Sequence, residues 1–127
     1  MWLPTVYVFV GGGSGAIVRE ISMLMLGRYS AAFPVDIFVA NIIASFLLGL
    51  VSGLHQKHRA SDSQSLLIAT GFCGGLSTFS SFIFGAYSEA MKPENLLLSI
   101  LYVIASLVIG YAAAWLGLRA TLRSRRA

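Results

Sequence analysis

The sequence has few charged residues. Lys, Arg, Asp and Glu make up 11% of its 127 residues, whereas soluble domains carry roughly 25%. Hydrophobic residues make up 57% of the chain, and the mean hydropathy is +0.79. This composition excludes a soluble globular protein and predicts a chain embedded in a lipid bilayer.

Cysteine, histidine and paired carboxylates are also scarce. The single cysteine, Cys73, excludes an internal disulfide, and no Cys/His cluster has the spacing of metal ligands. His55 and His58 lie beside basic residues in a polar loop, where solvated side chains are expected. Neither a nucleophile–base pair nor paired carboxylates occur within an apolar segment. The sequence therefore predicts that this protein is not an enzyme.

What is abundant is apolar sequence, and it is arranged in four segments. Each segment is close to the roughly 20 residues that cross a bilayer as a helix. We expect one all-α domain over residues 1–127, with membrane helices at about 3–26, 35–54, 65–91 and 95–118. No charged region precedes the long first segment, which favours a spanning helix over a cleaved signal peptide.

The third segment contains a run of glycines and hydroxyl residues from Gly71 to Phe82. Glycine is a poor helix former, so we expect the helix to break around Gly74-Gly75 and to restart near Ser77-Thr78. A break in a membrane exposes backbone groups that protein, water or an ion must satisfy. The alternative is a face for close helix packing, like that predicted for Gly11 in the first segment.

Several polar side chains lie within the predicted spans. Arg19 either faces protein or water inside the membrane or extends to the lipid headgroups. Asn41 either bonds a neighbouring helix or faces a polar path. Phe79 and Phe82 share one helix face beside hydroxyl residues such as Ser81, which lipid would not favour, although such aromatic stripes also face lipid or a core.

Small and basic residues indicate assembly and orientation. Glycine and serine faces on all four segments imply oligomerisation, because four short helices hardly enclose a pore.

Basic residues gather at segment ends, which suits lipid headgroups rather than nucleic acid. The N-terminus, the loop after the second segment and the C-terminal tail share one side, and that side carries most of these charges: Lys57, Arg59, Arg119, Arg123, Arg125 and Arg126. We therefore expect cytoplasmic termini.

Three motifs together resemble the Fluc/CrcB fluoride channels over essentially the whole chain. The first is Gly12-x-x-Gly15-Ala16-x-x-Arg19, the second is Asn41, and the third is the long stretch from Gly71 to Phe82. The resemblance implies an antiparallel dimer in a bacterial cell (inner) membrane, with two fluoride pathways along its interface. It implies passive export of fluoride from the cytoplasm.

The resemblance also implies roles for individual residues. Phe79 and Phe82 match an aromatic pair whose ring edges meet fluoride, and Asn41 matches a pathway asparagine. Arg19 matches a vestibule residue. A track of hydroxyls corresponds to Ser80, Ser81, Tyr102 and Ser106. A structural Na⁺ at the dimer centre would be held by the backbone carbonyls of Gly74 and Ser77.

The sequence departs from the family's pattern at Ile37, Gly85, Gly110 and Ala114, where polar residues are usual. These departures leave open a homodimer or a heterodimer with an inverted paralogue, in which this chain serves as an accessory subunit. A small dual-topology, proton-coupled exporter is a further alternative. Such an exporter needs a carboxylate in the membrane, for which Glu20 is the candidate in the first segment.

Overall fold

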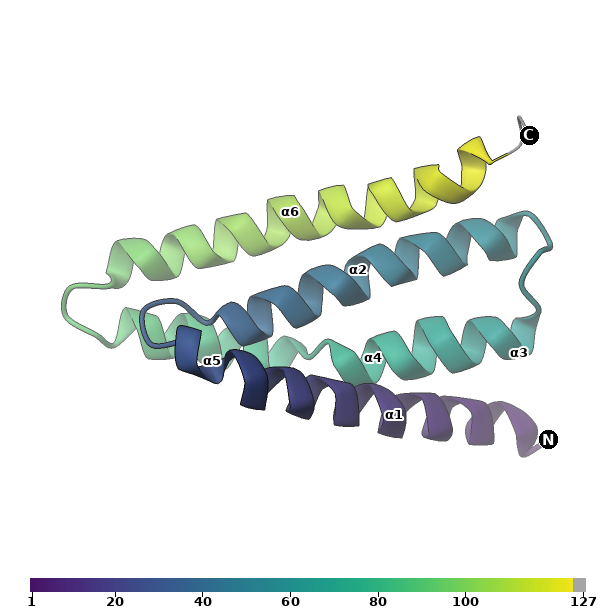
Figure 1. Ribbon diagram of the computed structural model, residues 1–127, viewed down its shortest axis with the longest axis horizontal. Coiled ribbons are helices and arrows are strands. Elements are labelled where there is room, and N and C mark those ends of the chain that lie inside the picture. Colours follow the sequence, from purple (N-terminus) through teal and green to yellow (C-terminus); the bar gives the residue numbers. More distant parts are fainter. Residues whose placement is uncertain (125–127) are drawn as a thin grey trace.

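The computed structural model describes residues 1–124, and the predicted tail residues Arg125 and Arg126 lie outside this part. Four stretches are long and apolar enough to cross a membrane: Leu3–Tyr29, Val35–Gln56, Asp62–Ala90 and Leu96–Arg123. The prediction of a helical protein with four potential membrane spans is therefore confirmed (Figure 1).

The first, second and fourth spans are continuous helices, whereas the third is divided. The elements are α1 (Leu3–Leu26), the 3-10 turn η1 (Gly27–Tyr29), α2 (Val35–Gln56), α3 (Asp62–Ser65), the π-helical η2 (Leu66–Phe72), α4 (Cys73–Leu76), α5 (Phe79–Ala90) and α6 (Leu96–Arg123). A capping box at Ser61 and Gln64 starts the third span a few residues before the expected Ser65.

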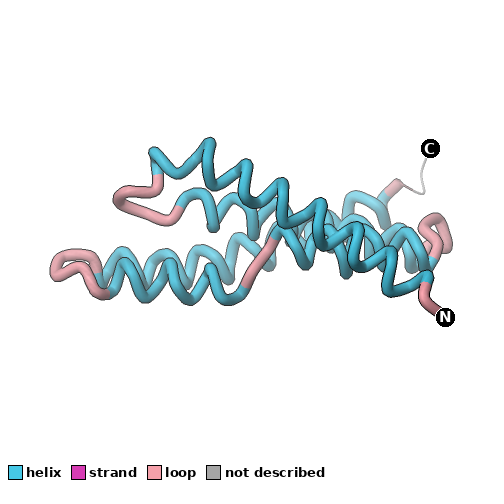
Figure 2. Tube along the Cα trace, turned by 90° about the horizontal axis from the view of Figure 1, so that it is seen from below, coloured by secondary structure: helices cyan, strands magenta, loops and turns pink. Residues whose placement is uncertain are grey.

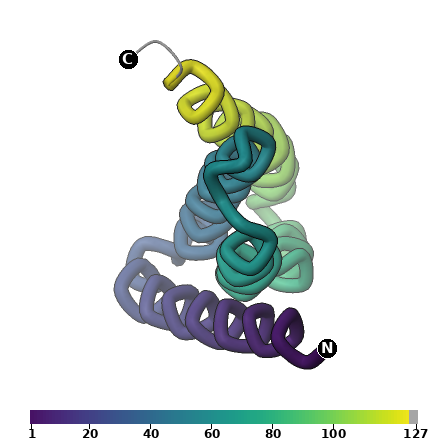
Figure 3. Tube along the Cα trace, turned by 90° about the vertical axis from the view of Figure 1, so that its right-hand side faces the viewer, coloured from purple at the N-terminus to yellow at the C-terminus, as the bar shows by residue number. Residues whose placement is uncertain are grey.

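The helices stack from α1 at one edge to α6 at the other, as the end-on view in Figure 3 shows. α1 packs on η2 and α4, α2 packs along α6, and α5 also contacts α6. Both termini and the loop after α2 lie at the same end of the molecule (Figure 1). α2 and α6 therefore run in the same direction, and the basic residues of that loop lie at the same end as the helical arginines near the C-terminus.

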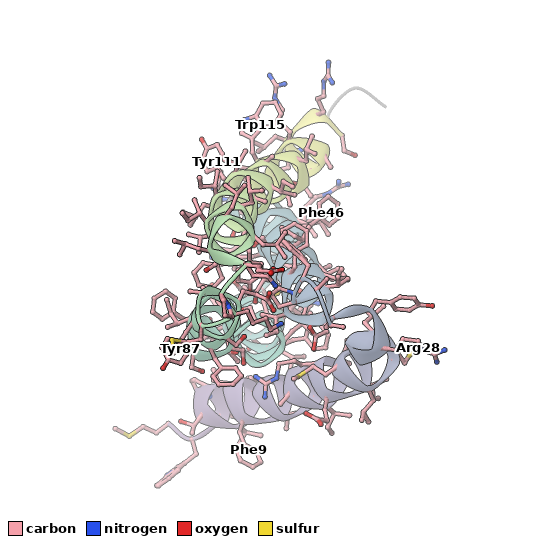
Figure 4. All side chains as sticks on the ribbon, turned by 90° about the vertical axis from the view of Figure 1, so that its left-hand side faces the viewer. Phe9, Arg28, Phe46, Tyr87, Tyr111 and Trp115 are labelled. Atoms are coloured by element: carbon pink, nitrogen blue, oxygen red, sulfur yellow. The ribbon has the colours of Figure 1, made fainter. Side chains whose placement is uncertain are left out.

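Large apolar side chains cover the outside of this stack. Phe9 and Tyr111 are 79% and 76% exposed, and Figure 4 shows both pointing away from the helices. The buried hydrophobic residues in the described chain are mostly small, with Tyr102 and Leu76 as the large exceptions. An apolar exterior around a small interior is the arrangement expected where lipid surrounds the helices.

Glycines allow the helices to approach at two seams. Between α1 and the third span, a Cβ at Gly11 would overlap the carbonyl oxygen of Leu67, and one at Gly75 would overlap that of Gly12. Between α2 and α6, a Cβ at Gly49 would overlap the carbonyl oxygen of Ala114. Helices in lipid associate largely through such close backbone packing, because no hydrophobic effect drives them together.

The third span is interrupted at Ser77 and Thr78, not at Gly74-Gly75 as the sequence led us to expect. Ser77 (φ −90°, ψ 142°) and Thr78 (φ −138°, ψ 129°) are extended, and Figure 2 shows the resulting loop between two helices. Gly74 and Gly75 belong to α4, and no glycine within residues 1–124 has a positive φ. At Gly75 the missing side chain serves close packing against α1, so the alternative interpretation of the glycines is correct there.

Candidate functional site

The interruption in the third span brings two helix ends of opposite polarity together. Thr78 caps the start of α5, where its hydroxyl oxygen accepts a hydrogen bond from the backbone N–H of Ser81 at 3.2 Å. On the other side, the guanidinium of Arg19 donates a hydrogen bond of 3.2 Å to the carbonyl oxygen of Gly75 in α4. A cation at a helix carboxyl end is favourable, and an amino end attracts anions.

An open groove of about 270 Å³ lies next to the interruption. Residues of α2, of the interruption, of α5 and of α6 line it: Asn41, Ser45, Ser77, Thr78, Phe79, Phe82, Ser106 and Leu107. Asn41 supplies an amide with two N–H donors, and the Ser and Thr residues supply hydroxyls. The fold thus brings hydrogen-bond donors from three spans into one place in an otherwise apolar protein.

Aromatic rings form one wall of the groove. The ring centroids of Phe79 and Phe82 are 6.0 Å apart, with an interplanar angle of 37°. Phe82 packs in turn on the buried Tyr102, whose centroid lies 5.5 Å away, and Phe33 contacts the other side of Tyr102. Phe79 is 76% exposed, so its ring edge is accessible from outside the chain.

Two hydroxyls near this wall are buried without a hydrogen-bond partner in the described residues: those of Tyr102 and Ser106. An unsatisfied buried hydroxyl costs roughly 1–3 kcal/mol, so such groups call for an explanation. Ser106 lines the groove directly, and an acceptor bound there could receive its hydrogen bond.

A family model described as CrcB-like protein, Camphor Resistance (CrcB), matches residues 6–118. The chain belongs to the CrcB family of fluoride ion channels. It is 50% identical over 113 residues to the Fluoride-specific ion channel FluC 3 of Yersinia pseudotuberculosis, a match that covers 89% of this chain and 84% of the relative. It is 42% identical over 117 residues to FluC of Gloeothece citriformis, covering 91% and 94% of the two chains.

A third relative, Fluoride-specific ion channel FluC 1 of Brucella abortus, is 41% identical over 115 residues. That match covers 90% of this chain but 43% of the relative, so the chain spans less than half of that protein's length. The CrcB relatives are named as ion channels, which makes this a transport family rather than an enzyme family. The four apolar helices agree with a multi-pass membrane protein.

The fold brings together most of the residues that were predicted to line the fluoride pathway. Asn41, Phe79, Phe82 and Ser106 line the groove. Ser81 and Arg19 line a second, much smaller cavity, which also touches Asn41. Tyr102 lies behind Phe82.

Ser80 and Gly74 do not line the groove, whereas Ser77 does. Ser80 is exposed on α5. Gly74 is exposed in α4, and a Cβ there would meet nothing within 4 Å in this chain. The hydroxyl of Ser77 donates to the carbonyl oxygen of Cys73 at 2.8 Å, so its side chain is engaged within the helix end.

Two polar lining residues were missing from the predicted site, namely Ser45 and Thr78. Ser45 follows Asn41 by four residues and shares its helix face, a spacing that could have identified it. Thr78 precedes α5 as its cap, and a Thr followed three residues later by a polar residue is a usual signal for a helix start.

The acidic residue Glu89 lies apart from the groove, near the loop between α5 and α6. It is 3% exposed, and its carboxylate accepts hydrogen bonds from Lys92 at 2.7 Å and from the amide of Asn95 at 3.0 Å. These contacts join the end of α5 to the start of α6. Glu89 therefore has a structural role, because its carboxylate holds the end of α5 next to the start of α6.

Proposed function

We propose that this protein conducts fluoride passively and selectively, exporting it from the cytoplasm across a bacterial inner membrane. The observation that carries the proposal is the groove at the interrupted span, where Asn41 and Ser106 present donors beside the rings of Phe79 and Phe82. We propose fluoride as the conducted ion because the relatives are named fluoride-specific ion channels.

The chemistry of the groove suits a small, strongly hydrated anion. Fluoride accepts hydrogen bonds, so its water can be replaced by the amide N–H groups of Asn41 and by hydroxyls such as that of Ser106. The positive edges of the Phe79 and Phe82 rings add weaker contacts. The capped amino end of α5 contributes a favourable field. Weak, multiple contacts of this kind permit entry and exit.

The same groove supports an antiparallel dimer. It is open along one side of a single chain, so an ion in it would face lipid unless another protein surface covered it. Exposed Gly74 and Phe79 lie on either side of the interruption and offer a small and a large surface for such a partner. The partner would be either an inverted second copy or an inverted paralogue.

A structural Na⁺ fits the chemistry of α4. Carbonyl oxygens near a helix carboxyl end lack helical N–H partners, and they are the hard ligands that Na⁺ takes. Gly74 leaves its backbone accessible, because no side chain covers it and a Cβ there would meet open space. Gly74 and Ser77 of one chain supply few ligands, so a complete site needs both subunits. A bound cation would neutralise the carbonyl dipoles at the interface.

Basic residues favour cytoplasmic termini. The end of the molecule with both termini carries Lys57, Arg59, Arg119 and Arg123 within the described residues, whereas the loops at the opposite end carry Arg28 and Lys92. Loop Lys and Arg residues set membrane orientation, and the side with more of them stays in the cytoplasm. A fixed orientation would require an oppositely inserted paralogue for antiparallel pairing.

Purified protein in KF-loaded liposomes, followed with a fluoride electrode, tests this function. Adding valinomycin should release fluoride from proteoliposomes and not from empty liposomes, and chloride should stay inside. Fluoride efflux without valinomycin that takes up protons from the external medium in a fixed ratio would indicate the proton-coupled exporter instead. Efflux only after co-reconstitution with an inverted paralogue would assign the accessory role. Absence of efflux in both preparations contradicts the proposed function.

A further inference from the structure

Two of the helices that line the groove at the interrupted span, α2 and α6, extend beyond it toward the end of the molecule that carries both termini. A second open groove of about 300 Å³ lies between the same two helices, lined by residues that include Ser52, Gln56 and Trp115. The α2 residues that line the two grooves recur every three or four positions: Asn41, Ser45, Leu48, Ser52 and Gln56. Such spacing places them on one helix face.

Ser45 lies on α2 between Asn41, which lines the first groove, and Leu48, which lines the second. It lines the first groove four residues beyond Asn41, which is about 6 Å farther along the helix axis. Its hydroxyl oxygen lies 3.7 Å from the position that a Cβ would take at Gly110 of α6. The α2 hydroxyl therefore lies beside the space that a side chain at position 110 would enter.

The hydroxyls of Ser45 and Ser52 are free to donate. A serine within a helix commonly donates to a carbonyl of the preceding turn, as Ser22 does to Val18 at 2.8 Å and Ser88 to Gly85 at 3.0 Å. Within the described residues 1–124, neither Ser45 nor Ser52 makes such a bond, although both line a groove. On α6, Gly110 and Ala114 carry no side-chain donor, whereas Tyr111 and Trp115, which line the second groove, carry one each.

We propose that Ser45 binds fluoride as the next donor after Asn41 and Ser106, and that Ser52 and Gln56 line its exit toward the end with the termini. The assignment rests on the proposed function and deepens it, because it names α2 as the helix that lines the fluoride pathway between Asn41 and the end with the termini. The hydroxyl of Ser45 donates one hydrogen bond to the ion, and the second groove has room for water to accompany it. A water takes about 30 Å³ of liquid volume.

A loss-and-rescue experiment tests the role of Ser45. In the liposome assay, Ser45→Ala should slow fluoride efflux by about tenfold or more, the effect expected from losing a hydrogen bond to a charged group. Ser45→Ala combined with Gly110→Ser should restore much of the rate, because position 110 has space for a Cβ and faces the same point. Ser22→Ala is the matched control, since that hydroxyl is exposed on α1 and bonded to its own helix.

The outcomes separate this assignment from the proposed function. Efflux in the parent protein, slowed in Ser45→Ala and recovered in the double variant, supports the assignment. Efflux in the parent that is unchanged in Ser45→Ala overturns the assignment and leaves the proposed function intact. Equal slowing in Ser45→Ala and Ser22→Ala, or a double variant no faster than Ser45→Ala despite normal elution on gel filtration, also overturns it. No efflux in the parent overturns both.

Discussion

Two neighbouring glycines in α4 should respond very differently to the same added methyl group. Gly75 faces α1, where a Cβ would overlap the carbonyl oxygen of Gly12. Gly74 faces open space in the single chain, where a Cβ would meet nothing within 4 Å. Because the residues are adjacent in one short helix, Gly74→Ala and Gly75→Ala change helix propensity in the same way. Any difference between them therefore reports the contact with α1.

The structure gives a rough size for the difference. At Gly75, the added carbon would also lie 2.9 Å from the carbonyl carbon of Gly12 and 3.0 Å from the backbone nitrogen of Ala16. These atoms belong to backbone, so α1 and α4 must move apart to accommodate the added carbon. Overpacking of this kind costs about 1–3 kcal/mol, which is a factor of about 5 to 150 in the unfolding equilibrium constant. The bond from Arg19 to the Gly75 carbonyl would be disturbed as well.

Unfolding in detergent with increasing dodecyl sulfate, followed by circular dichroism at fixed protein concentration, measures this effect. Gly75→Ala should unfold at a clearly lower dodecyl sulfate fraction than the parent, and Gly74→Ala should match the parent or exceed it slightly. Equal midpoints for Gly75→Ala and the parent would refute the close contact between α1 and α4. A large loss in Gly74→Ala would show that the open space beside Gly74 is filled in the folded protein.

Further substitutions probe the ion site, the interface and the orientation. Phe82→Ile should slow fluoride efflux at least tenfold with unchanged elution on gel filtration, because it removes the ring edge and keeps an apolar side chain; undiminished efflux argues against the aromatic role. Asn41→Asp should abolish efflux, because a carboxylate repels the anion, and a conducting variant would reduce Asn41 to a helix contact. Gly74→Leu should retain helix content yet fail to cross-link as a dimer; normal cross-linking would place the interface elsewhere. Reporters fused to the C-terminus, one active inside the cell and one outside, should signal the cytoplasm, and strong signal from both would indicate dual insertion.

The spans were predictable because bilayer thickness imposes a length and a polarity that are visible in any apolar run. Helix ends were less predictable, since local contacts set them. α6 continues to Arg123, five residues beyond the expected end at Leu118, and its Arg119 guanidinium lies 4.3 Å from the ring centroid of Trp115. Such a contact depends on side-chain placement that hydropathy does not encode.

The position of the interruption was not predictable from glycine propensity. Gly74 and Gly75 weaken a helix by about 1 kcal/mol each relative to Ala, but at Gly75 packing against α1 requires the missing side chain. The chain departs from the helix at Ser77 rather than at the glycines, whereas the helix restarts after the Thr78 cap, close to the predicted Ser77-Thr78. Residue types at the groove were identified from the resemblance, whereas Ser45 was missed although its four-residue spacing from Asn41 places both on one helix face.

The Arg19 contact has a consequence for the sign of the ion that crosses the groove. Of the two half-helix ends that meet there, the carboxyl end has a guanidinium on its Gly75 carbonyl, while the amino end borders the groove through Thr78 and Phe79. Both features raise the electrostatic potential in the groove. The energy of a cation that enters the groove is therefore raised, and the energy of an anion is lowered. Under a KF gradient, the reversal potential should therefore follow that of fluoride, and replacing Arg19 with Gln should move it toward that of K⁺.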